Sequence, residues 1–239
     1  MRLPFFSFIN SYICVMRRIV ILFLMLTAVL RAQTNDTVKS AKYLEDQIYI
    51  GLSMITLTNL DDYIAQSGFS NSFSFGFIKD IPVNLKGNFA FGLGIGYGGN
   101  TYFQNIKITE QDNISYYEIA GADVTKNKFS FQTIDFPIEI RLRTSTLDKY
   151  KFWRLYAGGK IGYVVSSSAK FREDGNSTKI KGISELNKWQ YGLSLAVGYG
   201  TWNFNFYYGL SDIFSNAKLN GVKPIEIKDI RIGLIFYIL

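Results

Sequence analysis

IRIGLIFYIL, residues Ile230–Leu239, is the stretch of sequence that decides the fold. Every second side chain in it is apolar, and the positions between hold Arg231, Gly233, Ile235 and Tyr237. Such alternation is typical of a β-strand with one face in an apolar environment. A strand of this kind at the end of the sequence predicts the last strand of an outer-membrane β-barrel, which closes against the first strand and presents its apolar face to lipid.

The same ten residues also resemble the terminal signal that marks such barrels for insertion. We interpret Arg231, Gly233, Phe236 and Ile238 as that signal, with Leu239 one residue beyond the usual aromatic stop. The resemblance implies recognition by the barrel-assembly machinery and outer-membrane lipid as the surroundings.

The first residues resemble a secretory leader. Arg17 and Arg18 precede the apolar run Ile19–Leu26, and a small residue suited to signal-peptidase cleavage, Ala32, stands before Gln33. An apolar run this short predicts a cleaved signal peptide and not a transmembrane helix.

We therefore expect residues 1–32 to be the signal peptide, with Met16 as the true start, residues 33–46 to be a short periplasmic tail, and residues 47–239 to be the barrel. Cys14 is the only cysteine and falls before Met16, so the mature chain is expected to have no thiol. This excludes disulfides and thiolate catalysis.

Composition agrees with export and gives no support to nucleic-acid binding. Four arginines and no acids lie before residue 33, so the net charge of +7 falls to +3 for the remaining 22 basic and 19 acidic residues. The chain is 48% hydrophobic and 16% aromatic, yet no later apolar run is long enough for a spanning helix. A membrane crossing must then use strands.

The body of the chain contains eight segments with an apolar face of period two, which predicts an all-β, eight-stranded antiparallel up-and-down transmembrane barrel. The opposite faces are small or polar. The segments are 48–54, 69–77, 89–97, 134–142, 153–165, 189–199, 204–210 and 230–238.

Connections between these segments alternate between short and long. Outer-membrane barrels have short periplasmic turns and long external loops, so we expect the loops at about 58–68, 103–128, 167–187 and 215–225 to face the cell exterior. Polar residues dominate them, which predicts solvated and mobile loops.

Charged residues occur at inward positions of the predicted strands. We expect them to form a paired cluster across the lumen, because isolated charges are unfavourable in a low dielectric. A narrow ion path or a small-ligand site is the alternative. The residues are Asp135, Glu139, Arg141, Arg143, Arg154, Lys160 and Arg231.

Nothing in the sequence predicts catalysis or a cofactor. The chain has no histidine, so the usual base for activating a serine or a water is missing. The glycines at 92, 94, 96, 98 and 99 have strand periodicity, which differs from a nucleotide-binding turn. The acidic loops lack the ligand spacing of a calcium-binding loop, so we expect neither catalytic nor metal-binding residues.

Several phrases of the sequence resemble the PorT/SprT-like proteins of Bacteroidetes, which are outer-membrane barrels associated with type IX protein secretion and gliding motility. The resemblance implies an outer-membrane protein that supports cargo export together with other secretion-system proteins. The phrases are KYLEDQIYIGL (Lys42–Leu52), GFIKDIP (Gly76–Pro82), FPIEIRLRTST (Phe136–Thr146), FWRLYAGGKIGYV (Phe152–Val164) and GLIFYIL (Gly233–Leu239).

Two other classes of protein remain open. A small surface barrel that acts in adhesion or envelope stability accounts for the same physical features. A narrow diffusion channel is also compatible, although an eight-stranded barrel encloses only enough space for its own side chains.

Overall fold

The computed structural model describes residues 46–84, 87–111, 114–144 and 153–238. The chain divides into two units, Met1–Ala41 and Lys42–Leu239, and every described residue lies in the second. The predicted signal peptide, its cleavage site at Ala32 and Gln33, and Leu239 therefore lie outside the described residues.

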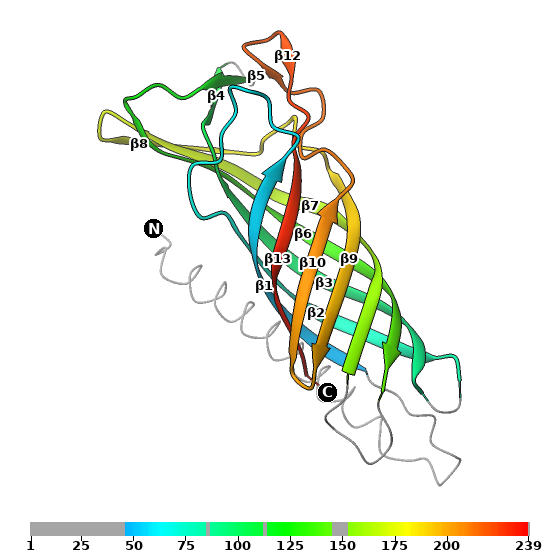
Figure 1. The fold of residues 1–239 in the computed structure, drawn as a ribbon. Helices are drawn as coiled ribbons and strands as arrows, with labels where there is room; N and C mark the ends of the chain where they lie inside the picture. The colour runs from blue at the N-terminus through cyan, green and yellow to red at the C-terminus, as the bar shows by residue number, and fades with distance from the viewer. Residues whose placement is uncertain (1–45, 85–86, 112–113, 145–152, 239) are drawn as a thin grey trace, which may run out of the picture. The chain divides into compact units, whose positions relative to one another are not determined.

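Eight strands form a closed antiparallel ring in which each strand pairs with the next one along the barrel, and the last pairs with the first (Figure 1). This is the predicted fold. The ring strands are β1 (Gln47–Thr58), β2 (Asn71–Pro82), β3 (Phe89–Phe103), β6 (Val124–Arg143), β7 (Trp153–Glu173), β9 (Trp189–Tyr199), β10 (Trp202–Gly209) and β13 (Lys228–Ile238).

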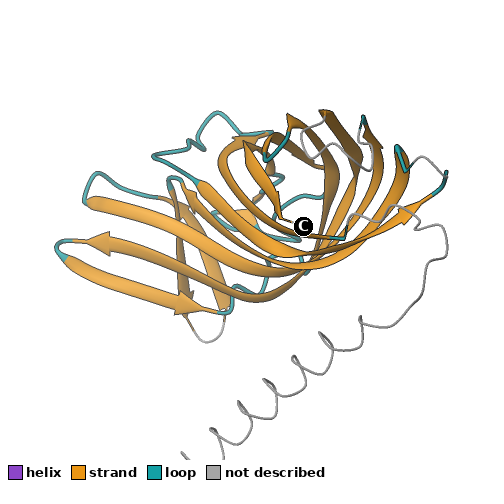
Figure 2. Ribbon diagram, turned by 90° about the horizontal axis from the view of Figure 1, so that it is seen from below, coloured by secondary structure: helices purple, strands orange, loops and turns teal. Residues whose placement is uncertain are grey.

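Pairing of β13 with β1 closes the ring. The two strands stay in register from Ile48 opposite Ile238 to Thr58 opposite Lys228, and β13 pairs with β10 on its other side. Figure 2 shows the strands curving round into the ring when the barrel is seen from below. Closure matters because lipid offers no partner for an exposed backbone N–H or C=O group.

The apolar faces predicted from the sequence all point outward. Leu52, Phe75 and Leu193 are 54%, 46% and 54% exposed, although each lies in the middle of a strand. An exposed apolar band around a whole barrel is suited to a hydrocarbon environment and unsuited to water.

Paired aromatic side chains lie at two levels of this band. Trp153 contacts Tyr199 with ring centroids 5.5 Å apart, and Tyr163 contacts Trp189 at 4.9 Å. Ten residues of β7 separate the two levels, which is about 33 Å of strand and about 25 Å across the membrane after strand tilt. That height matches the apolar band of outer-membrane barrels.

The barrel has a turn end and a loop end. The turn end carries the start of β1, the end of β13 and tight connections such as Gly200–Thr201, where Gly200 has a φ of +59°. The loop end carries the four long connections predicted from the sequence (Figure 1).

The long connections are more structured than the sequence predicts, although many of their residues are exposed. Their described residues contain five further strands, four of which form a small second sheet in the order β12-β11-β5-β4, which we call the cap sheet. The five are β4 (Ile106–Gln111), β5 (Ile114–Ile119), β8 (Asn176–Lys181), β11 (Lys218–Leu219) and β12 (Lys223–Pro224).

A hydrophobic core joins the cap sheet to the barrel. It combines barrel residues such as Ile55 and Phe131 with cap residues such as Ile108, Tyr117 and Leu219, all of them buried. Most apolar residues of these loops are surrounded by polar ones, so the sequence did not reveal that they share a buried face.

Removal of residues Ile230–Leu239 tests the role of β13. We expect the truncated protein to form no heat-modifiable barrel, because β1 and β10 each lose their hydrogen-bonding partner in lipid. Gel mobility with and without boiling measures this. As a control, excision of β8 (Asn176–Lys181) removes a strand outside the ring and should leave a heat-modifiable band; a normal folded band from the truncation would show that closure does not depend on β13.

Candidate functional site

The lumen near the turn end contains a buried cluster of charges centred on Asp80. Arg143 donates from Nη2 to Asp80 Oδ2 at 2.7 Å, and Arg141 donates from Nη1 to Asp80 Oδ1 at 3.2 Å. Arg141 also donates from Nε to Glu139 Oε2 at 3.0 Å. The side chains of Arg141, Arg143 and Asp80 have no exposed surface. We call Asp80, Glu139, Arg141 and Arg143 the turn-end cluster.

Tyrosine rings and glycines accommodate the large side chain of Arg141. Its guanidinium lies 4.6 Å from the ring centroid of Tyr156 and 5.9 Å from that of Tyr237, within cation–π distance. A Cβ at Gly92 on the neighbouring strand β3 would lie 2.6 Å from Arg141 Nε. The inward glycines predicted from the sequence therefore leave space for charged and aromatic side chains that fill the lumen.

A second buried cluster lies toward the loop end. Arg231 donates from Nε to Asp229 Oδ2 at 2.7 Å and from Nη1 to Asn100 Oδ1 at 2.7 Å, and the hydroxyl of Tyr102 donates to Asp229 at 2.8 Å. We call Asn100, Tyr102, Asp229 and Arg231 the loop-end cluster. Its members come from β3 and β13, which β1 and β2 separate in the ring.

Lys160 and Asp135 form a further ion pair between the two clusters, with Nζ and Oδ2 3.3 Å apart. The ring of Tyr207 lies beside two cations, 4.8 Å from Lys160 Nζ and 4.6 Å from the guanidinium of Arg231. Charged side chains and tyrosine rings thus lie in contact along the inside of the barrel.

The structure places the seven predicted lumen charges as follows. Six lie in the ion pairs just described, and Arg154 is buried near the turn end, where it donates to the carbonyl of Gly200. Sequence reasoning missed Asp80 and Asp229, because it placed Asp80 in a turn and began the last strand at Ile230. Continued alternation past Ile78 and before Ile230 was the signal that could have found them.

The four residues of the predicted terminal signal occupy both faces of β13. Phe236 points outward and packs against Trp202 with ring centroids 5.1 Å apart, and Ile238 is 48% exposed. Arg231 points inward, and a side chain at Gly233 would meet the backbone of Leu52 and Ser53.

The cap has its own polar contacts. The hydroxyl of Tyr117 donates to Glu185 Oε2 at 2.7 Å, which ties the cap sheet to the segment before β9. Partial burial opposes ionisation of Glu185, but hydrogen bonds led by that from Tyr117 lower the pKa of this carboxyl. The charged form is favoured in the folded state, so this contribution to stability is lost as pH falls through the lowered pKa.

Two features were not found among the described residues. Within them, no group of three or more His, Cys, Asp or Glu side chains is arranged to hold a metal ion. No helix of that part of the chain is long and apolar enough to cross a membrane. Each lumen carboxylate described above pairs with an arginine or a lysine, and the chain has no histidine.

The closed ring, the outward apolar band and the polar lumen define an outer-membrane β-barrel protein. Residues 31–215 match the family described as outer membrane protein beta-barrel domain, and the chain belongs to that family. The match stops before β13, yet β13 closes the ring. The search of curated proteins finds no match.

Two solved structures are similar over most of their length, and both are of Ail, the attachment invasion locus protein of Yersinia pestis. One, in complex with the heparin analogue sucrose octasulfate, has 14% identity and a TM-score of 0.37 over 81% of this chain and 97% of that chain. The other has 11% identity and a TM-score of 0.35 over 80% and 96%.

Substitution Asp80→Asn tests the turn-end cluster. It leaves Arg141 and Arg143 without their shared carboxylate, so we expect a loss of about 3–5 kcal/mol in the free energy of unfolding. Urea unfolding of the refolded barrel in lipid vesicles measures it. Asp61→Asn, which breaks a solvent-accessible ion pair with Lys223, is the matched control and should change stability little. Equal effects of both substitutions would argue against a buried, interdependent cluster.

Proposed function

We propose that this outer-membrane barrel supports protein export by the type IX secretion system, and gliding motility in a host that glides. The resemblance of its strand phrases to PorT/SprT-like proteins carries the proposal. The structure adds support, because Asp80 belongs to one of these phrases, and Arg141 and Arg143 belong to another. Phrases far apart in the sequence thus supply one buried cluster.

The packing of the lumen favours an accessory or assembly role over a conduit. Arg141 and Tyr156 are 0% and 1% exposed at the turn end, and Phe129 and Phe131 are fully buried toward the loop end. Side chains that fill the lumen leave no passage for a cargo protein and disfavour a diffusion channel. We infer that the lumen charges stiffen the barrel and that the protein acts through contacts with partners instead of through chemistry.

We further propose that the turn end lies in the periplasm and the loop end outside the cell. The strand ends that the short connections join lie at one end, as expected for the periplasmic side of such barrels. In this orientation β13 ends at the periplasmic side, where the barrel-assembly machinery would recognise Gly233 and Phe236. The cap is then presented to the exterior.

Single cysteines test this orientation. Gly121→Cys and Asn176→Cys, exposed at the loop end, should react with a membrane-impermeant maleimide on whole cells, whereas Thr201→Cys in the β9–β10 turn should not. All three should react after cell lysis, which controls for accessibility. Labelling of the cysteine at 201 alone on intact cells would reverse the proposed orientation.

A surface barrel acting in adhesion is the second candidate. The observation that favours it is the cap, whose strands pack on a hydrophobic core shared with the barrel and form a defined surface at the loop end. A protein that needed only its lumen and barrel wall would not require such an elaboration.

Deletion of the gene separates the two candidates. We expect type IX cargo proteins to accumulate in the periplasm and, in a gliding host, spreading to be lost; quantitative proteomics of medium and periplasm measures cargo location. The wild-type gene supplied in trans should restore export. Normal export in the deletion strain, with reduced surface attachment, would reject the secretion role and favour the adhesion barrel.

A further inference from the structure

Six basic side chains lie on one outward face at the loop end, where β6, β7 and β8 continue beyond the apolar band. We call them the basic face: Lys126, Lys128, Lys170, Arg172, Lys179 and Lys181. Lys128 is half-buried and the other five are exposed.

Strand register places like charges directly opposite one another on this face. Lys126 is opposite Arg172, and Lys128 is opposite Lys170, which in turn is opposite Lys179 on β8. Three lysines therefore stand in one row across three strands. Like charges in such positions destabilise a sheet, so the arrangement calls for an anion that offsets their repulsion.

The acids that the structure describes do not provide that anion. Among the described residues, no carboxylate forms an ion pair with any of the six. Glu173, the nearest acid along β7, points to the opposite face and pairs with Lys107 at 2.5 Å.

Protection of a sheet edge explains only part of the basic face. Lysines on an edge strand discourage pairing with other chains, and this accounts for Lys179 and Lys181 on β8. Lys128, Lys170 and Arg172 lie on strands that are paired with neighbours on both sides. Protection of a sheet edge therefore does not explain these three cations.

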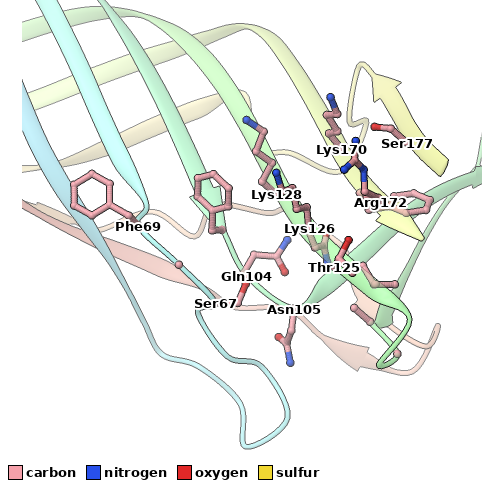
Figure 3. Close-up of a pocket in the computed structure, with 17 residues that line it drawn as sticks. Ser67, Phe69, Gln104, Asn105, Thr125, Lys126, Lys128, Lys170, Arg172 and Ser177 are labelled. Carbon is pink, nitrogen blue, oxygen red and sulfur yellow. The ribbon is translucent and has the colours of Figure 1, made fainter. Parts of the chain in front are cut away.

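A cavity of about 770 Å³ opens beside the basic face, and its lining includes Lys126, Lys128, Lys170 and Arg172 but no acid. Figure 3 shows these four cations gathered on neighbouring strands, with Phe69 on the other side. Phe69 is 62% exposed, and Lys128 Nζ lies 5.3 Å from the ring centroid of Phe103. The site thus combines positive charge with an apolar border.

The location of this site identifies its ligand. Lys128 and Lys170 lie on the same outward face as the apolar residues Ile134 and Tyr163, farther toward the loop end. With the loop end outside the cell, on which this inference rests, that position adjoins the outer leaflet. We propose that the basic face binds the phosphorylated sugar head group of an outer-leaflet glycolipid, while its acyl chains contact the apolar wall below.

Lipid retention by the refolded barrel tests the proposal. The probe is diphosphoryl lipid A in phosphatidylcholine nanodiscs, with dephosphorylated lipid A for comparison, and native mass spectrometry counts the lipid kept by each barrel. We expect preferential retention of the phosphorylated form. Because each lysine near an anionic surface contributes about fivefold, Lys128→Gln with Lys170→Gln should weaken retention about 30-fold. High salt should weaken it as well.

The matched control is Lys218→Gln with Lys223→Gln, which removes the same charge from the cap sheet at the same end of the barrel. It should leave retention unchanged. Equal loss in both double variants, or equal retention of dephosphorylated lipid A, would overturn the proposal. So would equally tight binding of the water-soluble, deacylated head group, which would identify a soluble phosphorylated sugar as the ligand.

This outcome is separable from the proposed orientation. Both leaflets of the nanodisc contain the lipid, so retention does not depend on which end of the barrel faces outward in the cell. Failure of retention with correct maleimide labelling would reject the ligand alone, and retention with reversed labelling would reject the orientation alone.

Discussion

Backbone pairing between β1 and β13 is the interaction on which the rest of the molecule depends. In lipid, an open sheet edge leaves N–H and C=O groups with no partner, and only a closed ring satisfies them all. Closure brings Asp229 and Arg231 of β13 opposite Tyr102 of β3, so the polar lumen exists only once the ring is complete.

The lumen of an eight-stranded barrel must be filled by its own side chains, and this chain fills it with charge. Buried ions are tolerated where their partners are close, and here Asp80 accepts hydrogen bonds from two arginines. The inward glycines fit the same constraint, because a side chain at Gly92 would collide with Arg141.

Sequence alone predicted the ring and the faces of its strands, since lipid outside and a polar lumen inside impose a period of two on every strand of such a barrel. It did not predict strand ends. A lumen-facing aspartate such as Asp80 or Asp229 looks like a turn residue in the sequence, because aspartate is among the residues that favour turns. Which acid pairs with which arginine depends on strands that are distant in the sequence.

The cap was hidden from sequence reasoning for a related reason. Ile108, Tyr117 and Leu219 come from separate connections and form a buried surface only after the barrel has brought the connections together. Short strands with one or two apolar residues each carry little periodic signal, so long polar connections were interpreted as mobile loops.

Charged side chains are arranged differently on the two faces of the barrel wall. Inside, Arg141, Arg143 and Arg231 each have a carboxylate within 3.2 Å. Outside, the register of β6, β7 and β8 places the cations of the basic face opposite one another. These lumen arginines have their carboxylate partners within the barrel, whereas the described residues provide no carboxylate for the basic face, and this difference is the reason for proposing an external anion there.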